Sequence, residues 1–172
     1  MNLSNIVLYD SDYQRLREIL LQTQRELNAD LVLLIDRSGQ QIACEGPAQD
    51  VDLTSLASLA AANMAATEGL AGQVGEAAFS ALYHQGKQRS IHISDVSKRF
   101  SLVLLFANSV SLGMVRWRVR RATASLEEVF QGFMRRMEAR AVSHHPASDG
   151  LPTLHFSDDE LDTLFGNLKP KS

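Results

Sequence analysis

The sequence has few of the features that mark secreted, membrane-embedded or nucleic-acid-binding proteins. Only one of its 172 residues is a cysteine, Cys44, so an intramolecular disulfide is impossible, as is typical of a reducing compartment. The longest apolar runs, 31–35 and 102–107, are far shorter than the roughly 20 residues that a membrane-spanning helix needs. The first residues lack the basic and then apolar pattern of a secretory signal. These absences favour a cytoplasmic protein that does not insert into membranes.

The charge is nearly balanced overall but unevenly distributed along the chain. A net charge of −3 argues against a general nucleic-acid binder. Seven arginines fall within 116–140, whereas acidic residues crowd the segment 158–162. The basic run invites a nucleic-acid or membrane interpretation, but it is diluted by Glu127, Glu128 and Glu138. A solvent-exposed helix face is therefore the interpretation that we favour for the arginines.

Hydrophobic periodicity divides the chain into helical and extended segments joined by turn residues. Apolar residues at helical spacing predict helices over 11–28, 52–74 and 112–139, the second with Asp52 as a candidate N-cap. Short apolar or alternating runs predict strands over 30–36, 41–44, 79–84, 89–96 and 100–107. The expected order of elements is therefore α-β-β-α-β-β-β-α.

This order predicts a mixed α/β fold of the α+β type, with a five-stranded antiparallel sheet flanked by helices. Such an arrangement is an economical way to bury the apolar face of every element. We expect one domain over 9–141. The composition of 142–156, which includes the stretch SHHPASDGLPT, predicts a linker. A short C-terminal helix is predicted over 157–168.

The predicted helix over 52–74 is unusually rich in alanine and has two different faces. A helical wheel places one set of residues against the sheet, namely Leu53, Leu56, Ala60, Met64, Thr67, Ala71 and Val74. Small residues dominate the opposite face, which consists of Ser55, Ser58, Leu59, Ala62, Ala65, Ala66 and Gly69. No charged residue occurs over 53–67, and Gly69 costs about 1 kcal/mol relative to alanine inside a helix. Such a smooth face suits either burial within the monomer or dimer, or docking of a partner.

The segment 156–168 has the sequence signals of a helix that folds against a surface. Ser157 and Glu160 have capping-box spacing, and Phe156 and Leu161 occupy the positions of a hydrophobic staple. The apolar stripe of this helix consists of Leu161, Leu164, Phe165 and Leu168. A helix of about twelve residues is marginal in isolation, so it should order only against a surface. That surface is either its own domain or, as we favour, a groove on another protein.

No group of residues has the spacing of a catalytic or metal site. His144, His145 and His155 lie in or near the predicted linker without metal-ligand spacing. Cys44 lies in a predicted strand with no sign of activation, and the glycines match no phosphate-binding loop. The sequence therefore predicts a protein that is not an enzyme and that carries no metal or cofactor of its own.

Three stretches of the sequence, together with the order of elements, resemble the Roadblock/dynein light chain family. They are LVLLIDRSGQQIACEG, DLTSLASLAAANMAATEGLAGQVGE and SLGMVRWRVRRA. The resemblance covers roughly 9–133 and is closest to the bacterial MglB-type polarity proteins, which pair with the Ras-like GTPase MglA. The tail FSDDELDTLF also resembles the acidic C-terminal motif of that subgroup.

The resemblance implies a homodimer whose two sheets join edge to edge through the strand that contains Phe79, Leu82 and Tyr83. It also implies a GTPase, with its own GTP and Mg²⁺, docked across the paired second helices and stimulated to hydrolyse GTP. The C-terminal helix would be a second contact that assists nucleotide exchange. The implied setting is control of cell polarity or motility, with a cytoplasmic or polar location and other polarity proteins as further partners. With this resemblance, docking becomes the favoured role of the smooth helix face.

Two questions stay open at the level of sequence. Arg37 and Arg99, both in turns, could be offered as an arginine finger, but nothing in the sequence marks either of them. The MglB-like subgroup acts by repositioning the catalytic groups of the GTPase itself. A scaffold that binds a GTPase or another partner without changing its chemistry would have the same fold and the same interface.

Overall fold

The expected order of elements is present in the computed structural model, which describes residues 10–47 and 49–143. Its helices are α1 (Asp10–Leu27), α2 (Leu53–Gln73) and α3 (Leu112–Ser143). Its strands are β1 (Leu31–Asp36), β2 (Gln41–Glu45), β3 (Ala81–Gln85), β4 (Arg89–Val96) and β5 (Phe100–Ala107). The bounds of β4 and β5 are those that the sequence predicts, and α3 is four residues longer than expected.

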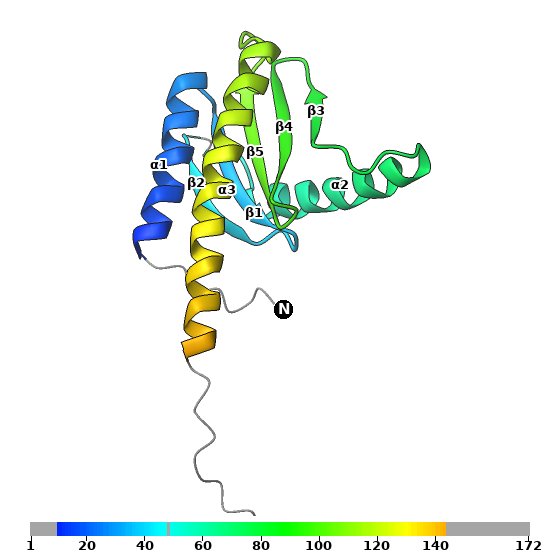
Figure 1. The fold of residues 1–172 in the computed structure, drawn as a ribbon. Coiled ribbons are helices and arrows are strands. Elements are labelled where there is room, and N and C mark those ends of the chain that lie inside the picture. Colours follow the sequence, from blue (N-terminus) through cyan, green and yellow to red (C-terminus); the bar gives the residue numbers. More distant parts are fainter. Residues whose placement is uncertain (1–9, 48, 144–172) are drawn as a thin grey trace, which may run out of the picture. The chain divides into compact units, whose positions relative to one another are not determined.

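The strands form one antiparallel sheet with the order β2-β1-β5-β4-β3 (Figure 1). The two most apolar runs of the sequence, β1 and β5, lie next to each other inside this sheet. The strands β2 and β3 are its edges. None of the helices within residues 10–47 and 49–143 combines the length and the hydrophobicity that a membrane span requires.

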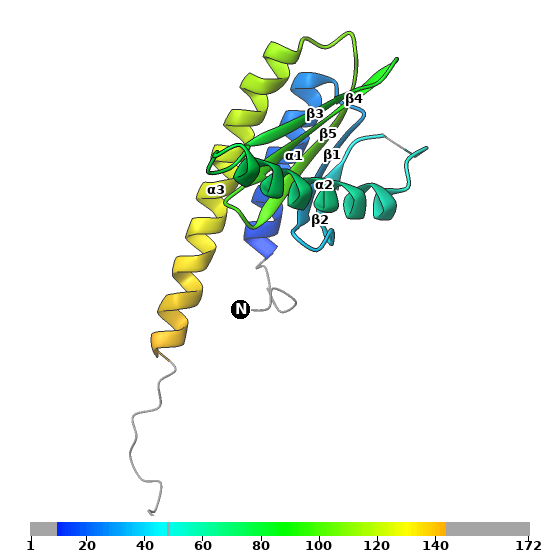
Figure 2. The same ribbon diagram turned by 90° about the vertical axis from the view of Figure 1, so that its right-hand side faces the viewer.

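The sheet separates two apolar cores, because α1 and α3 cover one face and α2 covers the other (Figure 2). Successive residues of β1 alternate between them: Val32 and Leu34 face α1 and α3, whereas Leu33 and Ile35 face α2. All four side chains are fully buried. Each contributes on the order of 2 kcal/mol by burial, and burial on both faces explains why β1 is apolar without interruption.

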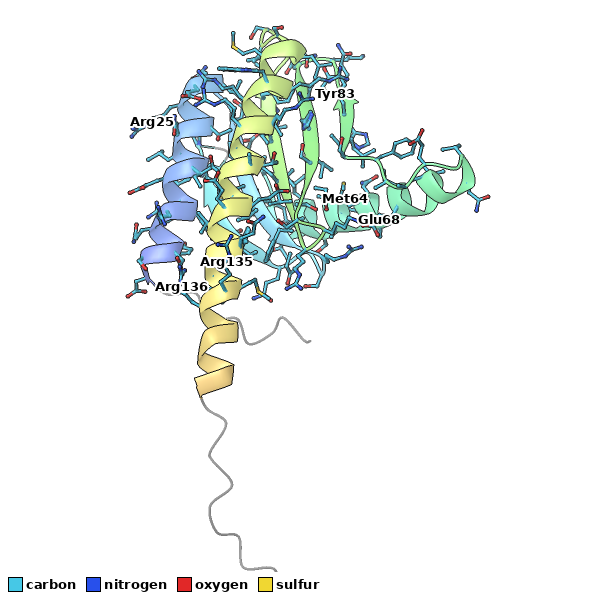
Figure 3. All side chains as sticks on the ribbon, viewed as in Figure 1. Arg25, Met64, Glu68, Tyr83, Arg135 and Arg136 are labelled. Atoms are coloured by element: carbon cyan, nitrogen blue, oxygen red, sulfur yellow. The ribbon has the colours of Figure 1, made fainter. Side chains whose placement is uncertain are left out.

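The long helix α3 is held against the sheet and α1 by an apolar stripe and an ion pair. The stripe is buried at Val115, Val119, Ala122, Leu126, Val129, Phe130 and Phe133. The Phe130 ring stacks on Phe100 of β5 with 3.9 Å between ring centroids. Arg136 donates to both carboxylate oxygens of the buried Asp12 in α1 at 2.6 Å (Figure 3 labels Arg136).

The prediction that β3 starts at Phe79 is wrong. Pairing with β4 starts where Asp95 donates its backbone N–H to the Ser80 carbonyl at 3.1 Å, and the first paired residue of β3 is Ala81, opposite Ser94. In the same register Phe79 would lie opposite Val96, the last residue of β4, but no pairing is present there. Phe79 therefore precedes the strand and stays exposed.

Candidate partner-binding surface

The start of α2 is defined by a polar cap. As predicted, Asp52 is the N-cap, and its Oδ1 accepts from the backbone N–H groups of Thr54 and Ser55, each at 3.1 Å. The Ser55 hydroxyl donates to Asp52 Oδ2 at 2.6 Å. Hydrogen bonds from Ser55 lower the pKa of Asp52, so the cap is ionised at neutral pH. The negative charge also suits the positive end of the helix dipole.

Two glycines allow the β1–β2 hairpin to pack closely against its neighbours. Gly39 has a φ of +84°, and a Cβ there would lie 2.9 Å from the Cα of Ser58 in α2. Gly46, with a φ of +129°, would place a Cβ 2.5 Å from the Asp30 carbonyl oxygen. Both positions combine a left-handed backbone with close approach, which only glycine accommodates without strain. The hairpin thus sets the position of the first half of α2.

The sheet-facing side of α2 agrees with the helical wheel except near the helix end. Ala60, Met64, Thr67 and Ala71 are buried, and Leu53 and Leu56 are half-buried. The wheel omitted Ala57, which is 1% exposed. It also placed Val74 against the sheet, and this prediction is wrong, because Val74 is 67% exposed. Val74 is the C-cap, and the end of α2 extends past the edge strand β3, where no sheet remains to cover it (Figure 1).

The opposite side of α2 is exposed at every predicted position. We call it the α2 surface, and it consists of Ser55, Ser58, Leu59, Ala62, Ala65, Ala66 and Gly69. Its hydroxyl groups are engaged within the helix, since Ser58 donates to the Thr54 carbonyl at 3.0 Å. The surface is therefore shallow and uncharged. This face is not buried within the monomer.

Two features of this surface were not apparent from the sequence. Leu70 is 60% exposed and lies one turn after Ala66, so with Leu59 (63% exposed) it extends the surface as an apolar stripe. The i, i+4 spacing from Ala66 was the signal that could have identified it. Gly69 has no atom within 4 Å of the position of an added Cβ. No contact within the described chain therefore requires a glycine there.

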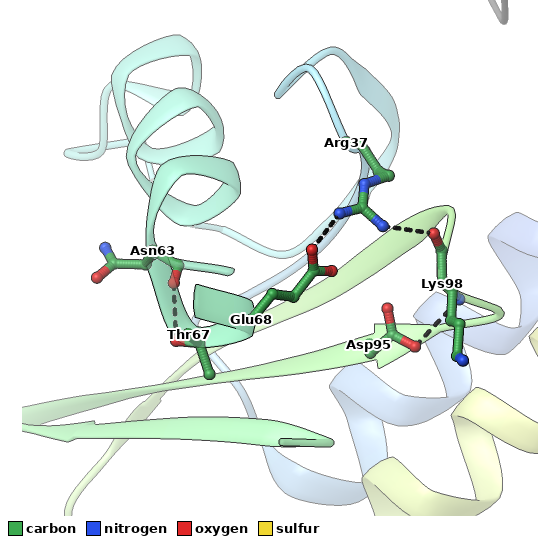
Figure 4. A network of polar contacts seen from close by, with 6 residues as sticks. All are labelled: Arg37, Asn63, Thr67, Glu68, Asp95 and Lys98. Carbon is green, nitrogen blue, oxygen red and sulfur yellow. Dashed lines mark hydrogen bonds and ion pairs between the residues drawn. The ribbon is translucent and has the colours of Figure 1, made fainter. Parts of the chain in front are cut away.

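A polar network borders the second half of α2. Arg37, in the turn after β1, donates to the Glu68 carboxylate of α2 at 2.5 Å and to the Lys98 carbonyl at 2.9 Å (Figure 4). The Asp95 carboxylate accepts from the Lys98 backbone N–H at 3.0 Å. Arg99 instead reaches the Met134 sulfur of α3 at 3.6 Å. Of the two candidate arginine fingers, Arg37 borders α2, and its guanidinium is hydrogen-bonded to Glu68 and to the Lys98 carbonyl. Arg99 points to the other face of the sheet.

The edge strand β3 carries two of the predicted dimer residues, Leu82 and Tyr83, on opposite faces of the sheet. Leu82 packs on the core beneath α2. Tyr83 faces α3 and stacks on Phe106, with ring centroids 6.4 Å apart, and its hydroxyl lies 3.1 Å from Ser90 Oγ. The five-residue strand contains no Lys or Pro and has no second neighbour within the described chain. Such an edge is open to pairing with another strand.

The remaining candidate groups do not form a chemical site among the described residues. Burial raises the pKa of the Cys44 thiol, and the neighbouring Glu45 adds to the effect, so the thiolate is disfavoured. No group of three or more His, Cys, Asp or Glu side chains in residues 10–47 and 49–143 could hold a metal ion. The predicted linker and C-terminal helix, including Phe156, Leu161, Leu164, Phe165, Leu168 and the three histidines near them, lie outside the described residues.

Comparisons with known proteins show which family and which solved structures this chain resembles. The family model of the Roadblock/LC7 domain matches residues 15–106. Among solved structures, Myxococcus xanthus MglB is 37% identical with a TM-score of 0.70, covering 74% of this chain and 96% of that one. The gliding protein MglB of Thermus thermophilus is 36% identical with a TM-score of 0.68, covering 73% and 95%. An MglB structure with a tetrameric arrangement is 35% identical with a TM-score of 0.70, covering 75% and 97%.

A comparison with curated proteins gave no match. The family model nevertheless spans more than half of the chain, and the similar MglB structures are covered almost completely. The order of helices and strands agrees with the same conclusion. This chain therefore belongs to the Roadblock/LC7 family, and MglB proteins are among its relatives.

Proposed function

We propose that this protein is a homodimeric regulator of a small Ras-like GTPase of the MglA type. It would bind the GTP form and stimulate hydrolysis without a catalytic site of its own. The observation that carries the proposal is the α2 surface, which is exposed and uncharged in a chain 35–37% identical to MglB structures. In a monomer such a face gains nothing from solvent exposure, whereas small side chains let a partner's backbone approach closely.

The residues of the α2 surface support docking in three ways. Leu59 and Leu70 supply apolar area, and the short side chains of the alanines between them let a partner approach the helix closely. The open space at Gly69 leaves room for a partner. The ion pair between Arg37 and Glu68 supplies polar groups at the border, where charges affect association rate and specificity more than affinity.

The expected mechanism is selection of a hydrolysis-ready arrangement of the GTPase. A regulator can shift an equilibrium only by the difference in its affinity for the two states. Preferential binding to switch regions that hold the GTPase's own catalytic groups in place would therefore raise the rate. The engagement of Arg37 by Glu68 and Lys98 supports activation without an arginine finger.

The proposed homodimer forms through β3. Pairing of this strand with the β3 of a second copy would join two sheets and bring two α2 surfaces to one side. The open edge and the position of Leu82 and Tyr83 support this arrangement. Phe79 would contribute only from outside the strand, as an exposed aromatic residue before it.

The C-terminal segment is proposed as a second contact with the GTPase that assists nucleotide exchange. Its capping box, staple and apolar stripe support this role, as does a linker that raises its local concentration near a partner already bound by the domain. The comparisons with MglB structures cover 73–75% of this chain. A cytoplasmic location, at a cell pole when bound to the GTPase and other polarity proteins, belongs to the same proposal.

Single-turnover GTP hydrolysis by the cognate GTPase, with and without this protein, tests the proposal. We expect specific binding to the GTP-loaded form and faster hydrolysis with the wild-type protein. Binding with an unchanged hydrolysis rate would favour the alternative, a scaffold that does not alter the chemistry of its partner. Failure to bind the GTPase in either nucleotide state would overturn both.

A further inference from the structure

A cleft of about 570 Å³ lies between α3 and the β3–β4 side of the sheet. Its polar lining includes Ser80, His92, Ser94, Arg116, Arg120 and Thr123. His92 and Ser94 alternate along β4 with Ile91 and Ile93, which face the core under α2. The cleft is therefore on the opposite face of the sheet from the α2 surface. It is not part of the α2 surface, although Ser80 and Ala81 at the start of the proposed dimer strand line it.

The floor of the cleft is polar although it is buried. His92 and Ser94 are each 4% exposed, and the Ser94 hydroxyl lies 3.2 Å from His92 Nδ1. Burial, reinforced by the nearby Arg116, lowers the pKa of His92 to about 4. At neutral pH the imidazole is therefore uncharged, and with the serine hydroxyl it offers hydrogen-bonding groups without negative charge. A sheet face that only packed against a helix would carry apolar residues here.

The positive charge of the cleft comes from two arginines one turn apart on α3. Other arginines in this part of the helix are engaged: Arg118 pairs with Glu26 at 2.6 Å, and the guanidinium groups of Arg118 and Arg121 lie 4.4 and 5.2 Å from the Trp117 ring centroid. The side chains of Arg116 and Arg120 have no hydrogen bond or ion pair within residues 10–47 and 49–143.

The two carboxylates at the margin of the cleft are already used by the β4–β5 turn. Asp95 accepts from the Lys98 backbone N–H at 3.0 Å, and Glu127 accepts from the Ser97 backbone N–H at 3.3 Å. Ser97 and Lys98 have positive φ angles of 56° and 57°, so this turn needs such support. Asp95 and Glu127 therefore stabilise the turn and keep their negative charge, and in the described part of the chain neither of them pairs with Arg116 or Arg120.

We propose that this cleft binds a small oxyanionic ligand, a phosphorylated or polycarboxylated molecule, through Arg116 and Arg120. A guanidinium pairs with phosphate or carboxylate oxygens by two parallel hydrogen bonds, and two guanidiniums one turn apart can hold two such groups. The Thr123 and Ser94 hydroxyls would bind the remaining polar groups. Only Ala81 and Val119 supply apolar lining, and the lining contains no Phe, Tyr or Trp side chain for stacking a base, which disfavours apolar or aromatic ligands.

The test uses the full-length protein with pyrophosphate and citrate as the phosphate and carboxylate probes. Thermal unfolding and isothermal titration calorimetry are run against sodium chloride at matched ionic strength. We expect a saturable rise in melting temperature with at least one probe and a measurable heat of binding. Preference for one of the two probes would identify the chemical group that the cleft recognises.

Variants separate the cleft from general attraction of anions. The double variant Arg116→Gln/Arg120→Gln should weaken binding at least tenfold, whereas Arg121→Gln, which removes one nearby positive charge outside the cleft, should change it less than twofold. Thr123→Glu, which adds a carboxylate to the cleft and leaves the arginines in place, should also weaken binding at least tenfold. No saturable effect beyond sodium chloride, or an equal loss in Arg121→Gln and the double variant, would overturn the proposal.

Discussion

The β1–β2 turn and α2 meet backbone to backbone at Gly39 and Ser58. A Cβ at Gly39 would lie 2.9 Å from the Ser58 Cα and 3.2 Å from the Ala57 carbonyl oxygen. Both contacts are with backbone atoms, so the neighbour cannot yield by changing a rotamer. The exposed face that starts at Ser55 and Ser58 is thereby held at a defined position relative to the sheet.

Replacing Gly39 by alanine should therefore destabilise the fold. The left-handed φ of +84° and the contact with Ser58 together predict a loss of about 1–3 kcal/mol in the free energy of unfolding. Gly69→Ala is the matched control, because it lies in a helix with open space around it and should gain about 0.5–1 kcal/mol. Chemical denaturation measures both, and equal effects in the two variants would contradict the packing described for Gly39.

Arginine on the α2 surface should abolish binding of the GTPase while the fold survives. In Ala65→Arg a long charged side chain would keep the two backbones apart and bury an unpaired charge, so we expect affinity to fall at least a hundredfold. The monomer has room for the new side chain, because Ala65 is exposed. Ala124→Arg, on an exposed position of α3, is the control and should bind normally. Calorimetric titration with the GTP-loaded GTPase measures affinity, and loss of cooperative melting in Ala65→Arg would show that this face is needed for folding.

Charge on the edge strand should shift the protein from dimer to monomer. His84 and Gln85 are exposed on β3, so His84→Lys with Gln85→Lys leaves the core intact. In an antiparallel pair of two β3 strands the four lysines would repel one another, and the dimer dissociation constant should rise at least tenfold. Light scattering over a micromolar dilution series measures this change. A wild-type protein that is monomeric throughout that range would refute the predicted dimer.

Deletion of 144–172 should leave a folded dimer with altered GTPase regulation. The segment beyond α3 is joined through a polar stretch, so its removal should not change the melting of the domain. If the tail is the second contact, binding should weaken and nucleotide turnover should change.

Phe165→Ala should reproduce much of the effect of the deletion, since an aromatic anchor commonly contributes more than about 1 kcal/mol to binding. Asp158→Asn with Asp159→Asn should weaken binding less and change its salt dependence. Unchanged affinity and turnover in the deletion would remove the tail from the proposed mechanism.

The buried His92 should make stability depend on pH in the acidic range. Its pKa is about 4 in the folded protein, below the ordinary value of 6.5. The unfolded chain therefore takes up a proton below about pH 6.5, while the folded chain does so only near pH 4. Stability should fall as pH decreases between these values, by on the order of 2 kcal/mol because the half-open cleft admits some solvent. Melting curves from pH 7 to 4 should lose this component in His92→Gln and keep it in the exposed control His84→Gln.

Much of the candidate surface could be predicted because it depends on local properties of the chain. The N-cap Asp52 and the separation of small from sheet-facing residues follow from hydrogen bonding and helical periodicity within α2. Val74 and Phe79 were misplaced for a different reason. Val74 is exposed because it is the C-cap at the end of α2, and Phe79 lies outside β3 because pairing with β4 starts only at Ala81. A helical wheel or an alternating pattern carries no information on where pairing starts or where a sheet ends.

The sequence by itself determined the order of elements, the two-faced character of α2 and the continuous apolar run of β1, because these are set by periodicity, capping and burial along one segment. Only the tertiary structure decided the order of the strands in the sheet and which arginines of α3 are engaged. The alternation of serine and histidine with isoleucine along β4 is visible in the sequence, but it did not show that α3 leaves a cleft above His92. That cleft depends on how α3 packs across β4 and β5, and packing between distant segments is decided by the fit of their side chains in three dimensions.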